Sequence, residues 1–171
     1  MAWNNSDGLL IKYGYEEAQV GGGGEFAVVD DVHTVEFDIR WNMLNAFGTR
    51  TILDETVRIP NGVIIISALF TTEVPFTSGG AATLSVGLCS PDRTTVFSAT
   101  GLINATALTT MDAVGEVVTG AGASLNTVLA NAAPNLIQAT VGTANYTAGR
   151  GKLRIRYFVP SPAPAIVGAL A

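Results

Sequence analysis

The stretch that decides the fold is EFAVVDDVHTVEFDIRW, residues 25–41, in which polar and apolar residues interleave. From His33 onward every second residue belongs to the mainly apolar set of this alternation: His33, Val35, Phe37, Ile39 and Trp41. Successive side chains of a strand point to opposite faces of a sheet, so this period of two predicts a half-buried strand. We expect His33 to lie at the end of the apolar face as a structural residue.

Further strand-like segments follow, separated by Gly, Pro, Asn and Ser. Residues 59–62, Ile-Pro-Asn-Gly, are a strong turn signal, because Pro fixes φ and Asn-Gly tolerates positive φ. Residues 63–70 are apolar almost without interruption, which predicts a strand buried on both faces. The segments at 82–90 and 93–100 predict two more strands, whereas 101–119 suits one or two short helical turns.

The last part of the pattern is typical of a hairpin. NLIQATVGT (135–143) predicts a strand, NYTAGRG (145–151) a turn, and KLRIRYFV (152–159) the final strand. Alternate residues of the final strand would face opposite sides, with Leu153, Ile155 and Tyr157 on one and Lys152, Arg154, Arg156 and Phe158 on the other. We expect the arginines to pair with carboxylates rather than with phosphates.

About eight such strands and no long helix predict an all-β fold, an antiparallel β-sandwich of jelly-roll type. We expect an N-terminal arm with a Gly-rich hinge (1–24), the sandwich (25–159) and a Pro/Ala-rich C-terminal tail (160–171). Four consecutive glycines (21–24) give the hinge its conformational freedom. The three prolines of the tail favour an extended course, so both ends are expected to be extended arms.

The charge content limits the classes of partner. Charged residues make up 13% of the chain, against roughly 25% in an average soluble domain. Such a surface is typical either of a Thr-rich sandwich exterior or of a protein covered by partners or by its own copies. The net charge of −5 argues against direct nucleic-acid binding, which needs a basic face. We expect neither a membrane partner nor a signal peptide, because the apolar runs are short and LLI is followed at once by charges.

Motifs for chemistry are scarce. His33 is the only histidine and Cys89 the only cysteine, which is too few for a histidine-based triad or a zinc site. The adjacent carboxylates at 30–31 and 54–55 would point to opposite faces of a strand and would not converge on a sugar. Residues 120–125 lack the third glycine of a dinucleotide loop. We therefore expect no enzyme, no cofactor and no metal, with Cys89 a small buried apolar residue.

The opening motif W-N-x-x-D-G-L-x-x-K-Y-G-x-E-E-A, Trp3 to Ala18, resembles the start of small virion structural proteins of tailed bacteriophages. Residues 51–54 with 57–62, residues 82–88, and residues 146–149 leading into 152–157 fit the same proteins in the same order. The Pro/Ala-rich tail departs from their pattern. The resemblance implies a non-enzymatic capsid decoration (cement) protein, with a tail or fibre-attachment protein as the alternative.

Under this resemblance the chain would be made in the host cytoplasm and would form a homotrimer on the capsid exterior. There it would bind the major capsid protein and oppose the pressure of packaged DNA. The expected partner-binding residues are apolar groups of the two arms: Trp3, Leu9, Leu10, Ile11, Tyr13, Ile166, Val167 and Leu170. A carbohydrate-binding module on a β-sandwich is an alternative of another class. It needs exposed aromatic platforms, and the chain has only two tryptophans, Trp3 and Trp41.

Overall fold

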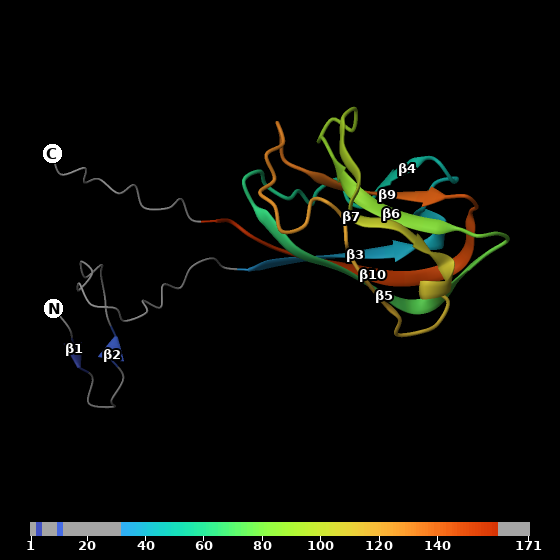
Figure 1. Ribbon diagram of the computed structural model, residues 1–171, viewed down its shortest axis with the longest axis horizontal. Helices are drawn as coiled ribbons and strands as arrows, with labels where there is room; N and C mark the ends of the chain where they lie inside the picture. The colour runs from blue at the N-terminus through green and yellow to red at the C-terminus, as the bar shows by residue number, and fades with distance from the viewer. Residues whose placement is uncertain (1–2, 5–9, 12–31, 161–171) are drawn as a thin grey trace.

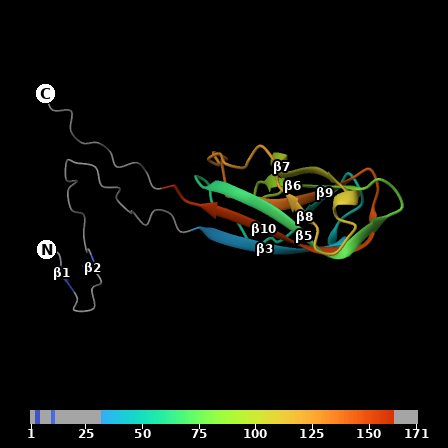
Figure 2. The same ribbon diagram turned by 60° about the horizontal axis from the view of Figure 1, so that its bottom comes forward.

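The computed structural model describes residues 3–4, 10–11 and 32–160, and residues 32–160 form a sandwich of two four-stranded antiparallel sheets (Figures 1 and 2). The first sheet has the order β3 (His33–Arg40), β10 (Tyr146–Phe158), β5 (Ile64–Ser78) and β8 (Val117–Thr119). The second has the order β4 (Arg50–Ile52), β9 (Leu136–Gly142), β6 (Thr83–Cys89) and β7 (Val96–Ala107). Two single-turn 3₁₀ helices, η1 (Trp41–Met43) and η2 (Leu108–Thr110), follow β3 and β7. Outside the sandwich, β1 (Trp3–Asn4) and β2 (Leu10–Ile11) pair with each other.

The connectivity of the sandwich is that of a jelly roll. Antiparallel pairs join β3 with β10, β4 with β9, β5 with β8 and β6 with β7, as in one long folded hairpin. That hairpin is rolled up, so that β10 also pairs with β5 and β9 also pairs with β6. Eight strands in two sheets with this nesting are the jelly-roll arrangement. The fold class expected from the sequence is thereby confirmed.

The period of two along β3 and β10 places their apolar residues in the core. Phe37 and Ile39 of β3 are buried, whereas the polar residues between them are exposed. In β10, Leu153 and Ile155 are buried beside them, and the register sets Leu153 between Phe37 and Phe70 of β5. Burying each such side chain contributes about 1.5–3 kcal/mol. The alternation predicted for both strands is confirmed.

The predicted C-terminal hairpin is wrong. Strands β9 and β10 lie in different sheets, so residues 143–145 cross from one layer to the other. Residues 146–151 are part of β10 and form no turn. The glycines there serve packing, because a Cβ on Gly149 would overlap the ring of Phe76 and one on Gly151 the ring of Phe70.

The run at 63–70 is buried on one face only. Ile65, Ala68 and Phe70 face the core, while Ile66 and Leu69 are partly exposed on the outer face. Strand β5 continues to Ser78, well beyond the apolar run. In a two-layer sandwich the outer face of each sheet has no covering layer, so an apolar run need not be buried on both faces of its strand.

Two further expectations concern the ends of strands. The segment 101–119 contains one helical turn, η2, as expected, but its first seven residues extend β7 and its last three form β8. Trp41 was expected on the apolar face of β3, and it is instead 45% exposed because η1 turns the chain out of the sheet. His33 lies at the other end of β3, where its ring stacks on Tyr157 at a centroid distance of 5.2 Å.

Candidate interaction surfaces

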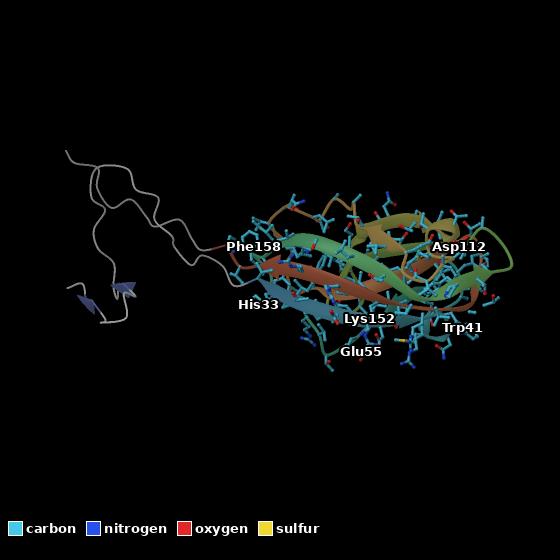
Figure 3. All side chains as sticks on the ribbon, turned by 90° about the horizontal axis from the view of Figure 1, so that it is seen from below. His33, Trp41, Glu55, Asp112, Lys152 and Phe158 are labelled. Atoms are coloured by element: carbon cyan, nitrogen blue, oxygen red, sulfur yellow. The ribbon has the colours of Figure 1, made fainter. Side chains whose placement is uncertain are left out.

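Both flanking segments join the sandwich at the same end. His33 at the start of β3 lies opposite Tyr157 near the end of β10, so the chain enters and leaves on adjacent strands (Figures 1 and 3). Of the arm residues expected to bind a partner, Trp3, Leu10 and Ile11 belong to the β1–β2 pair, in which Trp3 is opposite Ile11. The others lie outside the described residues: Leu9, Tyr13, Ile166, Val167 and Leu170.

One lateral edge of the sandwich is closed by backbone hydrogen bonds. The chain after β8 runs between β5 and β7 and bonds to both. The N–H of Gly120 donates to Ala68 O (2.7 Å), that of Gly122 to Leu102 O (3.1 Å) and that of Ser124 to Gly101 O (2.9 Å). These bonds link the two sheets along this side and leave little free backbone for a partner.

The opposite edge is open. Within the described residues β3 pairs only with β10, and β4 pairs only with β9. A groove of about 450 Å³ runs along β3, with apolar residues at its base and charged residues on its rim. Its lining is Glu36, Phe37, Asp38, Arg40, Met43, Leu53 and Asp54. An edge strand with unpaired N–H and C=O groups can accept a further strand from another chain.

The outer face of the first sheet carries charges of both signs that pair across strands. Arg154 Nη2 lies 2.7 Å from Glu36 Oε1 of β3, and Arg150 Nε lies 2.8 Å from Glu73 Oε2 of β5. Lys152 Nζ is 4.0 Å from the same Glu73 carboxylate. The expectation that the arginines of β10 pair with carboxylates is confirmed for Arg150 and Arg154. Because these pairs are half exposed, each contributes about 1 kcal/mol or less.

The end of the sandwich opposite the chain ends is apolar and aromatic. Figure 3 shows Trp41 there, together with Asp112, while His33 and Phe158 lie at the other end. Phe47, on the same loop as Trp41, is 56% exposed, and Val114 of the β7–β8 loop is also exposed. The loop bearing Phe47 is held in place, because the Phe47 N–H donates to Asn145 Oδ1 (2.7 Å).

A hollow of about 290 Å³ lies beside Trp41 at this end. It is lined by uncharged residues from the β3–β4 loop and from the crossing between β9 and β10: Trp41, Asn42, Leu44, Asn45, Ala46, Val141, Asn145 and Tyr146. The Tyr146 hydroxyl is buried and finds no hydrogen-bond partner within the part of the chain that the structure describes. Burial raises the pKa of this phenol far above its usual range.

The ionisable residues singled out in the sequence have structural partners. Asp54 and Glu55 do not converge, because Asp54 accepts hydrogen bonds from Thr56 whereas Glu55 forms an ion pair with Arg93. Cys89 is buried, and its burial raises the pKa of the thiol, which makes it unreactive. In the described ranges no three His, Cys, Asp or Glu residues gather as metal ligands, and no helix has the length and apolarity to cross a bilayer.

No protein-family profile and no curated protein matches the sequence at a significant level. Chains in solved phage capsids do share the fold. A chain of the cyanophage Pam1 capsid asymmetric unit gives a TM-score of 0.58 at 15% identity, over 86% of this chain and 98% of that chain. A chain of the Ralstonia phage GP4 capsid gives 0.56 at 22% identity, over 84% and 94%. A chain of the acid-stable capsid of Helicobacter pylori bacteriophage KHP30 gives 0.52 at 18% identity, over 78% and 92%.

At these identities the likeness shows a common fold. The superpositions cover at least 92% of each matched chain and at least 78% of this one, so those chains are similar to it in length. The β3 groove and the hollow beside Trp41 were not predicted from the sequence. The only sequence signal for the hollow is a tryptophan at a strand end followed by a loop with two asparagines, Asn42 and Asn45.

Proposed function

We propose that the chain is a non-enzymatic structural protein of a phage capsid, and that it is a decoration protein which binds and stabilises the major capsid protein shell. The observation that carries the proposal is the superposition on nearly whole chains of three phage capsids. The resemblance of residues 3–18 to the start of small virion proteins also supports it.

The surfaces of the sandwich suggest how such a protein would act. Both arms start at one end, so they would reach neighbouring subunits from a common point. The 31 residues before the sandwich span up to about 100 Å when fully extended, which is enough to cross to an adjacent subunit. The apolar residues of the arms would be buried on that subunit at about 25 cal/mol per Å² of apolar area. This binding would hold capsomers together against the pressure of packaged DNA.

The body would supply a second set of contacts. In a homotrimer, the open β3 edge and the mixed charges of the β3–β10 face would lie against neighbouring copies. An edge strand that is covered in the assembly is protected from uncontrolled strand pairing. A chain with only 13% charged residues also favours burial of its surface against other copies.

The proposal is tested on virions of the phage that encodes the chain. Quantitative mass spectrometry gives the copy number, and electron cryomicroscopy of particles with and without the protein gives its position. A shell decoration protein is expected in hundreds of copies on the capsid exterior. A dozen copies or fewer at one vertex would support a tail or fibre-attachment protein instead, and absence from the particles would refute both.

The role of the arm has its own test. A variant that lacks residues 1–20 should keep the unfolding transition of the sandwich and lose binding to undecorated shells. A matched control replaces residues 1–20 with a Gly/Ser sequence of equal length, which keeps the linker and removes the apolar groups. If either variant still decorates shells as the full chain does, the arm is not the binding element.

A further inference from the structure

We propose that the hollow beside Trp41 is a binding site for a neutral sugar. The site lies at the end of the sandwich opposite His33 and Phe158 (Figure 3). It is formed by residues about a hundred positions apart in sequence, which the fold brings together from the β3–β4 loop and the β9–β10 crossing. The capsid comparisons play no part in this inference.

The size of the hollow suits one sugar ring. Its volume of about 290 Å³ lies just below the range of about 300–1,000 Å³ that is usual for ligand pockets, as expected for a site that holds a single ring. The hollow opens to solvent, so a terminal sugar of a longer glycan could enter while the rest of the glycan stays outside.

Trp41 supplies the aromatic surface that the carbohydrate-binding alternative requires. The residue is 45% exposed, although tryptophan is usually well buried. Its backbone is fixed, since the N–H of Leu44 donates to Trp41 O across η1. The C–H face of a pyranose is apolar, and it packs on an indole ring by dispersion and weak C–H contacts. A half-exposed indole that lines the hollow is suited to such stacking.

The amides of the lining present both a donor and an acceptor. Asn145 Oδ1 accepts a hydrogen bond from the Phe47 N–H, which leaves its Nδ2 to donate. Asn45 Nδ2 donates to Arg50 O (2.7 Å), which leaves its Oδ1 to accept. Adjacent hydroxyls of a sugar can donate and accept in the same way. The two amides are oriented before any ligand binds, which lowers the entropic cost of binding.

Tyr146 lines the hollow from the core side. The residue is 5% exposed, and its ring packs edge-on against Phe76 in the core. Its hydroxyl is shut off from solvent, so a sugar in the open hollow would contact the exposed amides rather than this hydroxyl. The lining carries no charged side chain, which favours a neutral ligand over an acidic or amino sugar.

The test uses the isolated full chain, so its result does not depend on whether the chain decorates capsids. Ligand-observed NMR is recorded with glucose, galactose, mannose and N-acetylglucosamine, with glucuronic acid and glucosamine as charged counterparts. Binding of at least one neutral sugar is expected. Trp41→Ala should weaken it by about tenfold or more, as truncation of an aromatic anchor does. Phe47→Ala is the matched control, because Phe47 is an exposed aromatic of the same loop that does not line the hollow, and it should bind as the unmodified chain does.

Tyr146→Phe is a second control. It should leave sugar binding unchanged while it raises the unfolding temperature, because it removes an unpaired buried hydroxyl and keeps the ring. The proposal is overturned if no neutral sugar binds, if only charged sugars bind, or if Trp41→Ala and Phe47→Ala bind equally well. A folded Trp41→Ala chain, checked by thermal unfolding, is required for that comparison, and Trp41→Phe, which keeps an aromatic ring at the same position, should retain more of the binding.

Discussion

Replacing Gly122 by Ala should open the lateral edge that backbone hydrogen bonds close. A Cβ on Gly122 would overlap the backbone carbonyl of Gly101 on β7 and would lie 2.5 Å from Leu102 N. These atoms belong to backbone, so no flexible side chain can move aside. The φ angle of Gly122 lies outside the left-handed region, and the effect of the substitution is therefore steric.

The magnitude follows from two contributions. Forcing one extra methyl group into a packed region costs about 1–3 kcal/mol. The required shift also weakens the bonds from Gly122 N–H to Leu102 O and from Ser124 N–H to Gly101 O, which contribute about 1 kcal/mol each. Together they predict a loss of about 3–5 kcal/mol in the free energy of unfolding, a large part of the roughly 5–15 kcal/mol of a typical domain.

Urea unfolding of three variants measures this loss. With an m-value of about 2 kcal/mol per M, Gly122→Ala should lower the midpoint by about 1.5–2.5 M. Gly79→Ala is the first control, because nothing lies within 4 Å of its Cβ position, and its midpoint should stay nearly unchanged. Gly115→Ala is the second, because it has φ +85° and open space, and it should cost only the roughly 1–2 kcal/mol of a left-handed backbone.

The order of the three urea midpoints shows whether the segment after β8 lies in close backbone contact with β7. If Gly122→Ala unfolds at the same urea concentration as Gly79→Ala, that contact is absent and the description of this edge as closed is wrong. If Gly115→Ala is the most destabilised of the three, backbone conformation rather than close approach limits the stability of these loops.

Three further outcomes are expected. Burial raises the pKa of Tyr146 in the folded chain, so the phenol of the unfolded chain loses its proton first as the pH rises above about 10. The free energy of unfolding should therefore fall above about pH 10, and the fall should be smaller in Tyr146→Phe. Hydrogen bonds from Ser90 and Thr94 lower the pKa of Asp92 to about 2, so its contribution to stability should be complete above about pH 4 and decline as the pH falls toward 2, with an NMR titration midpoint near 2. Cys89 should react with a thiol reagent within minutes in urea and not under native conditions; fast native labelling would contradict its burial.

The fold could be predicted from the sequence where the period of two is regular. The alternation in β3 and in the last part of β10 is a direct consequence of one buried face, and it gives both the strands and their orientation. The jelly-roll expectation rested on the number of strands and the turn residues between them. The order of strands within each sheet is not encoded locally, because it depends on pairings between distant segments.

The predicted hairpin shows this limit. Asn145, Gly149 and Gly151 gave the signals of a turn, and those signals describe a local backbone preference only. In the structure the two glycines are the positions at which rings of the core lie against the strand. Whether a glycine serves a turn or a close contact is decided by residues elsewhere in the chain, here Phe70 and Phe76 of β5.

The candidate surfaces were predicted even less directly. Trp41 was in phase with the buried residues of β3, and it becomes exposed because η1 changes the chain direction immediately after the strand. Its neighbours in the hollow, Asn145 and Tyr146, belong to the segment misread as a turn. A tryptophan in register with a strand therefore did not reveal the aromatic platform that the carbohydrate-binding alternative needs.

The two proposals place different tasks at opposite ends of one rigid body. The arms leave beside β3 and β10 at one end, and the Trp41 hollow lies at the other (Figure 3). Chain ends attached at one end leave the opposite end free to face away from whatever the arms bind. On a capsid that end would face solvent, where surface glycans are accessible. The arrangement predicts that deleting residues 1–20 abolishes shell binding without changing sugar affinity, and that Trp41→Ala does the reverse. Loss of both activities in either variant would mean that the two ends are not independent.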